Sequence, residues 1–305
     1  MKEPITNATT ISFQTSTPTQ SPTSTLTTRF ARNTRVLRTD TPLSEDQMRT
    51  VAPSVFAQAK HSSRSDRYTY IPTIDVLRGL QREGFQPFMV AQGASRIEGK
   101  AEFTKHMLRL RHVSAEDNQI TRSEANEVIL INSHDGASSY QLLCGLVRFA
   151  CSNGLVVGSI TSDIRVAHKG NAIGEVIEGA TRVLKDFEAV DASTESMKTL
   201  TLNPEEEAAF ASAALALRYG QRGKDEPPLP ITADQLLAAR RPEDLGRSLW
   251  MVLNRIQENL QRGGLIGRSA LGRRIHTRAI GSIDRTVTLN RALWVLAEEM
   301  RKLKA

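Results

Sequence analysis

Arginine and glycine are interspersed in one segment near the carboxyl end of the chain, residues 261–278. The segment reads QRGGLIGRSALGRRIHTR and contains no acidic residue. A guanidinium group donates paired hydrogen bonds that match phosphate oxygens, and glycine lets the backbone approach such a ligand closely. The segment therefore predicts contact with a polyanion through five cations: Arg262, Arg268, Arg273, Arg274 and Arg278.

A second interpretation of this segment is a solvated loop between two helices, whose arginines pair with Glu298 or Glu299. The overall charge does not decide between the two. The 305 residues include 40 lysines and arginines against 33 aspartates and glutamates, a formal net charge of +7. Such a balance suits a nucleic-acid binder, but it also merely keeps many proteins in solution.

Two further arginines, Arg109 and Arg111, alternate with leucines in a predicted strand and should line one face of a sheet. A basic sheet face is a usual platform for single-stranded nucleic acid, normally with exposed aromatic rings on which bases stack. Aromatic residues are only 5% of this chain, and Tyr68, Tyr70 and Tyr140 are the nearby candidates. The pattern therefore predicts phosphate contact more than base stacking.

The densest group of side chains that could do acid–base chemistry follows the next predicted strand. His134 beside Asp135 could serve a metal ion or a general base, which makes a metal-dependent nuclease one hypothesis. Adjacent residues in a strand or turn usually point apart, however, and these are also the residue types that a hairpin turn requires. The role of this motif and of a second turn stays open; their residues are Asn132, Ser133, His134, Asp135, Gly136, Asn153 and Gly154.

Other chemistry is not indicated by the sequence. His106, His112 and His168 lack the spacing of zinc ligands, and we interpret them as core or surface residues. Cys144 and Cys151 read as reduced core residues, which favours a cytoplasmic location. No phosphate-binding loop, dinucleotide fingerprint or nucleophile motif is present, so we expect neither a cofactor nor a metal and favour a non-enzymatic protein. No apolar run is long enough to span a membrane.

Strands grouped before helices predict an α+β protein with an antiparallel β-meander. We expect a disordered polar arm over residues 1–40, an α+β core domain over 41–200, and a helical region with the basic Gly/Arg loop over 201–305. Thr73 is the predicted N-cap of a helix over 73–84. The other predicted helices are 44–53, 173–187, 204–219, 245–260 and 288–303, and the predicted strands are 88–90, 105–112, 127–132, 140–150, 155–157 and 163–166.

Several blocks of the sequence are shared with a known family, among them YIPTIDVLRGLQREGF, TKHMLRLRH, VILINSHDGASSYQLLCGLVRFACSNGLVVG and LWMVLNRIQENLQRGG. They resemble the phage/plasmid-like family called domain of unknown function 932, from residue 43 to the carboxyl end. The resemblance implies cargo of phages, plasmids or integrative elements, and hence a role in element maintenance or recombination. It implies no catalytic residue.

The leading hypothesis is therefore a mobile-element accessory protein that binds nucleic acid without catalysing a reaction; the expected ligand is DNA, with single-stranded DNA as one alternative. The first alternative is the metal-dependent nuclease centred on His134 and Asp135. The second is an interaction protein that inhibits a host defence complex by occupying its nucleic-acid channel. The sequence leaves open whether the chain forms a homo-oligomer or has a host protein as its partner.

Overall fold

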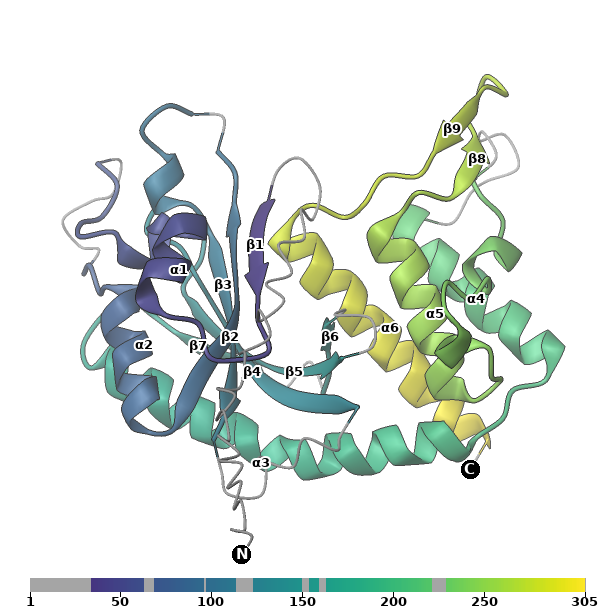
Figure 1. Ribbon diagram of the computed structural model, residues 1–305, viewed down its shortest axis with the longest axis horizontal. Coiled ribbons are helices and arrows are strands. Elements are labelled where there is room, and N and C mark those ends of the chain that lie inside the picture. Colours follow the sequence, from purple (N-terminus) through teal and green to yellow (C-terminus); the bar gives the residue numbers. More distant parts are fainter. Residues whose placement is uncertain are drawn as a thin grey trace, which may run out of the picture.

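The computed structural model describes residues 34–62, 69–95, 97–113, 123–149, 154–158, 163–220 and 229–304. Within them the predicted α+β class is confirmed: an antiparallel sheet packs against helices, and further helices follow it (Figure 1). The strands lie in the order β1-β2-β3-β4-β5-β6, with β7 also paired to β5. Their bounds are β1 (Thr34–Arg38), β2 (Phe85–Gly93), β3 (His106–His112), β4 (Glu124–Asn132), β5 (Tyr140–Arg148), β6 (Gly154–Val156) and β7 (Ile164–Val166).

Strand β1 corrects the predicted disordered arm of residues 1–40. It pairs with β2 from Thr34 to Arg38, and two of its residues, Val36 and Leu37, are buried on opposite faces of the sheet. The polar composition of the whole amino-terminal stretch outweighed this short apolar pair, because an average over forty residues hides a strand of five. The first 33 residues of the predicted arm lie outside the described residues.

Three helices cover one face of the sheet: α1 (Glu45–Val51), α2 (Thr73–Arg82) and α3 (Ala172–Thr199). Side chains from alternate strand positions, such as Leu108, Leu130 and Leu142, form the main core there with Val176 of α3. Helix α3 is longer than the predicted 173–187. It runs under the sheet and on to the carboxyl-terminal helices, so it joins the two halves of the molecule (Figure 1).

The opposite face of the sheet carries a smaller apolar cluster that includes Met89, Met107, Ile129 and Leu143. Ile283, the first residue of α6 (Ile283–Lys304), packs into this cluster. The start of the last helix therefore covers part of a sheet face that the strand pattern alone predicts to be open.

The carboxyl-terminal part contains α4 (Pro204–Tyr219) and α5 (Leu249–Arg262) beside α6. Asn203 and Glu206 form the capping box that opens α4. Helix α5 begins after Ser248, whose side chain accepts a hydrogen bond from the Met251 backbone, and most of its residues are buried. The short 3-10 helices are η1 (Pro53–Phe56), η2 (Ala101–Phe103), η4 (Asp234–Leu236) and η5 (Pro242–Asp244).

No helix among the described residues is both long enough and apolar enough to cross a membrane.

Candidate nucleic-acid interface

The Gly/Arg segment is a β-hairpin rather than a loop. Strands β8 (Ile266–Arg268) and β9 (Arg274–His276) pair with each other and project from the carboxyl-terminal helices, at the upper right of Figure 1. The turn between them is closed by a hydrogen bond of 2.9 Å from the Ser269 backbone amide to the Arg273 carbonyl. Gly272 adopts the left-handed conformation, with φ of 73°, which a glycine adopts without strain.

One face of the hairpin is exposed and basic. Arg268 lies directly opposite Arg274, and Ile266 lies opposite His276; all four residues are exposed. Two like charges directly opposite each other on a β-ribbon destabilise it. Within the described residues no carboxylate forms an ion pair with Arg268, Arg274 or their exposed neighbours Arg273 and Arg278.

The interpretation in which these arginines pair with Glu298 or Glu299 is wrong. Glu298 pairs with Arg301 at 2.8 Å and Glu299 with Lys302 at 2.7 Å, both one turn further along α6. These two carboxylates are therefore used within their own helix. The hairpin keeps its positive charge.

The other face of the hairpin rests on the segment that precedes η4. A Cβ on Gly267 would overlap the Pro230 carbonyl oxygen, and the Arg268 backbone amide donates to that same oxygen at 2.9 Å. The Gln235 side chain donates to the Ile266 carbonyl at 2.7 Å. At the hairpin base, a Cβ on Gly263 would come within 2.6 Å of the Arg278 backbone. These contacts hold the hairpin in one orientation before any ligand arrives.

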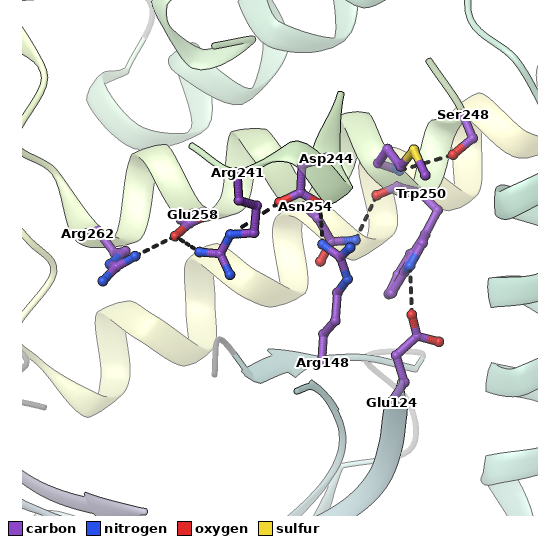
Figure 2. A network of polar contacts seen from close by, with 10 residues as sticks. Glu124, Arg148, Arg241, Asp244, Ser248, Trp250, Asn254, Glu258 and Arg262 are labelled. Atoms are coloured by element: carbon purple, nitrogen blue, oxygen red, sulfur yellow. Dashed lines mark hydrogen bonds and ion pairs between the residues drawn. The ribbon is translucent and has the colours of Figure 1, made fainter. Parts of the chain in front are cut away.

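Arg262 belongs to the support of the hairpin. Its guanidinium donates to Glu258 at 2.6 Å, and Glu258 also pairs with Arg241 (Figure 2). Arg241 lies 3.6 Å from Asp244, which pairs in turn with Arg148 of β5. Except for Arg262, whose side chain is 48% exposed, the residues of this chain of ion pairs are largely buried, and they link the last turns of α5 to the sheet.

A second link lies at the start of α5. The Trp250 indole donates to Glu124 of β4 at 2.9 Å, and Asn254 donates to the Trp250 carbonyl at 2.7 Å (Figure 2). Lys198 of α3 also pairs with Glu124, at 2.7 Å. Helix α5 is thus tied to the sheet at both of its ends, which makes it a firm base for the hairpin.

Arg109 and Arg111 do lie on one face of β3, but the expected open basic face is wrong for Arg109. Its side chain is 3% exposed, pairs with Glu127 at 3.2 Å and donates to the Leu155 carbonyl at 2.6 Å. Arg111 pairs with the same carboxylate at 3.1 Å. Burial lowers the pKa of Arg109 to about 10, although Glu127 opposes the shift.

Gly154, in the second turn motif, makes room for this buried cation. A Cβ at this position would overlap the Arg109 guanidinium. The motif glycine therefore has a packing role on β6. Its neighbour Asn153 lies outside the described residues.

The first motif contributes to a buried polar network around Thr73. The Thr73 hydroxyl oxygen lies 3.1 Å from His134 Nε2, 2.9 Å from His106 Nε2 and 3.0 Å from Asn132 Nδ2. His168 Nε2 lies 2.8 Å from Asn132 Oδ1. The predicted N-cap role of Thr73 is wrong: Pro72 is the N-cap, and the Thr73 side chain serves the network instead.

Hydrogen bonding fixes the protons of this network. Ser54 donates to Gln92 at 2.8 Å, so its oxygen accepts from His106 Nδ1 at 2.9 Å. His106 Nε2 is then an acceptor for the Thr73 hydroxyl, and His134 Nε2 must donate to the Thr73 oxygen. Burial lowers the pKa of His106 to about 3 and that of His134 to about 4. Both imidazoles are therefore neutral near pH 7.

His134 and Asp135 turn to different partners. The Asp135 carboxylate lies 3.2 Å from Lys100 Nζ and accepts a hydrogen bond from the Ala137 backbone at 2.9 Å. Ser133 accepts from the Ser138 backbone at 2.8 Å, and Gly136 has φ of 77°. These are the contacts of a turn. No group of three or more described histidine, cysteine, aspartate or glutamate side chains could hold a metal ion.

Sequence reasoning missed the part of this network that comes from other elements. His106 and His168 are buried, as core histidines are, and they meet His134 through Thr73 and Asn132. Their positions in the sequence are far apart and follow no ligand spacing. The one available signal was a threonine at the start of a predicted helix, which fits a cap equally well.

The fold and the hairpin define an α+β protein with a projecting, arginine-rich β-ribbon. The chain belongs to the family described as "Domain of unknown function (DUF932)", which matches residues 60–294. This confirms the resemblance stated from the sequence. The matched range contains the hairpin, Thr73 and the three histidines of the network.

Two curated relatives come from Escherichia coli (strain K12). The chain is 50% identical over 265 residues to "UPF0380 protein YafZ", an alignment that covers 87% of this chain and 94% of the relative. It is equally similar, at 50% over 265 residues and with the same coverage, to "UPF0380 protein YfjQ". The comparison with solved structures gives no match.

Proposed function

We propose that this protein is a non-enzymatic accessory protein of a mobile genetic element and that it binds DNA through the β8–β9 hairpin, in element maintenance or recombination. The observation that carries the proposal is the Arg268 and Arg274 pair: the two lie opposite each other, and no carboxylate among the described residues pairs with either. Such a pair costs stability in the free protein. An anion between the two guanidinium groups removes that cost, and a phosphate backbone supplies anions in series.

The position of the hairpin supports the same partner. It projects beyond α4, α5 and α6 (Figure 1), and two further exposed arginines, Arg273 and Arg278, flank strand β9 in the sequence. A two-stranded β-ribbon fits a groove of duplex DNA. The mobile-element context rests on the resemblance to a phage/plasmid-like family, and with DNA as partner the proposed location is the cytoplasm.

The nuclease hypothesis has less support. His134 is fully buried, and its Nε2 is used by Thr73. Asp135 is held by Lys100 and by its own turn. A base that activates water must reach the substrate, and neither group is presented to one.

Fluorescence anisotropy with labelled single-stranded and duplex oligonucleotides tests the proposal. We expect tight binding at low salt and a steep loss of affinity with added salt, because bound phosphates release counterions. The double variant Arg268→Gln/Arg274→Gln should bind far more weakly. A matched control, Arg182→Gln/Lys302→Gln, removes two exposed cations from α3 and α6 and should bind like the wild type.

Absence of binding at low salt would end the proposal. A wild-type protein that binds no oligonucleotide but captures a host nucleic-acid-binding protein through the hairpin would favour the inhibitor hypothesis instead.

A further inference from the structure

The tip of the hairpin is apolar. Leu271 is 81% exposed, and it lies between Ser269 and Gly272 in the turn that joins β8 to β9. Tight turns ordinarily carry glycine, asparagine, aspartate, serine or proline, whose backbone preferences or side chains suit the turn. A leucine at this place gains no burial from the fold. Its side chain is presented to whatever the hairpin meets.

The turn holds Leu271 in one place. The Gly272 amide donates to the Ser269 carbonyl at 2.8 Å, and the Arg273 amide donates to the Ser269 hydroxyl at 3.2 Å. The Arg268 guanidinium donates to the Gly272 carbonyl at 3.2 Å, so one cation is fixed just behind the apolar tip. The hairpin therefore presents a rigid apolar tip together with a cation on each of its strands.

We infer that Leu271 is a wedge that enters the base stack of duplex DNA when the hairpin lies in a groove, and that it kinks the duplex. This inference rests on the proposed function. Proteins that bend DNA insert apolar side chains between base steps, and phosphate contacts on either side offset the unstacking cost. Here Arg268 and Arg274 flank the wedge and supply those contacts.

The dimensions of the hairpin agree with this role. Each strand has three residues, which span about 10 Å, and this exceeds the depth of either groove, about 8.5 Å for the major and about 7.5 Å for the minor groove. The tip can therefore reach the base edges while the arms stay beside the phosphates. Single-stranded nucleic acid has no continuous stack of base pairs to wedge apart, so the inferred ligand is a duplex.

Two readouts with the full-length protein test the wedge: fluorescence of 2-aminopurine in the centre of a duplex, and energy transfer between dyes at the two duplex ends. The wild type should raise the 2-aminopurine signal several-fold and increase energy transfer. Leu271→Ser should retain duplex binding within about threefold but lose both signals. Leu303→Ser, which changes a leucine that is 83% exposed at the end of α6, should behave like the wild type.

The outcomes separate this inference from the proposed function. Wild-type protein that binds the duplex without either signal, or that binds only single strands, overturns the wedge and leaves nucleic-acid binding in place. Leu271→Ser protein with undiminished signals also overturns it. Wild-type protein that binds no nucleic acid overturns both. An unchanged melting temperature of Leu271→Ser shows that any lost signal comes from the tip and not from misfolding.

Discussion

The arginines of the sheet and those of the hairpin differ in burial and in ion pairing. Arg109 and Arg111 share Glu127 inside the protein, and Arg109 is almost fully buried. Arg268 and Arg274 face each other in solvent. The difference lies in what surrounds each guanidinium group. On the sheet, the Glu127 carboxylate and the backbone of β6 lie against Arg109, so its charge is paired inside the fold. On the hairpin, no carboxylate in the described part of the chain pairs with Arg268 or Arg274, and both residues are exposed to a ligand.

Removal of Glu127 should give the largest effect, because it leaves Arg109 buried without its carboxylate. We expect Glu127→Gln to lower the free energy of unfolding by about 3–5 kcal/mol, measured by urea denaturation. Glu178→Gln is the matched control, since the ion pair of Glu178 with Arg182 is exposed and worth no more than about 1 kcal/mol. Equal stability of the two variants would mean that the sheet arginines are not held as described.

The buried histidines extend the comparison to side chains that become cations only when acid protonates them. Their pKa values are about 3 for His106 and about 4 for His134 in the folded state, against 6.5 as the ordinary value. The unfolded chain therefore binds more protons below pH 6.5, so stability is present above that pH and is lost as the pH falls toward 4. Each of the two histidines should lower the free energy of unfolding by about 2 kcal/mol between pH 7 and pH 5.

Urea denaturation at a series of pH values checks this expectation. In the His106→Gln variant, the free energy of unfolding should fall by about 2 kcal/mol less over the same pH interval than in the wild type. The His276→Gln variant, which changes an exposed histidine of β9, should lose as much stability as the wild type. An equal loss of stability with falling pH in the His106 variant and the wild type would show that His106 is not held neutral by the network.

An added methyl group at Gly154 sharpens the comparison at the level of packing. Gly154→Ala places a Cβ on the Arg109 guanidinium, and we expect a loss of about 1–3 kcal/mol in denaturation experiments. Gly93→Ala is the control, because its Cβ would sit at an ordinary 3.5 Å from the Lys105 carbonyl. If both alanines are tolerated equally, the guanidinium has room to move.

The smallest effect has the opposite sign. Arg274→Gln removes the like-charge pair with Arg268, so the free protein should gain about 0.2–1 kcal/mol of stability while it loses DNA affinity. Melting temperatures at low salt measure the gain, and Arg182→Gln serves as the surface control. A loss of stability in the Arg274 variant would show that the hairpin needs this cation for its own fold.

The sequence pattern was sufficient for the meander but not for what covers it. Alternation of Arg109 and Arg111 with leucines places them correctly on one face, yet only the full chain shows that Ile283 and Leu155 return to that face. The hairpin escaped prediction because each strand has three residues and its turn, SALG, lacks the usual asparagine or aspartate before glycine. Long-range packing decides the covered sheet face, whereas the hairpin was missed because its local signals are weak.

Only part of the candidate site could be predicted, because some of its residues are close in the sequence and others are not. The arginines of the hairpin were named from composition alone, since a run of cations without carboxylates stays basic in any local structure. The network around Thr73 draws on residues from Ser54 to His168, and no local spacing joins them. Its members become neighbours only once β3, β4 and α2 are packed together.

The salt dependence of duplex binding tests the central claim most directly. The logarithm of the affinity should fall with the logarithm of salt concentration at a slope of about 0.9 per phosphate contacted, and Arg268→Gln/Arg274→Gln should reduce that slope by about two contacts. The control variant Arg182→Gln/Lys302→Gln should keep the wild-type slope. Equal slopes for the wild type and the hairpin variant would contradict the claim that these opposed arginines hold the DNA.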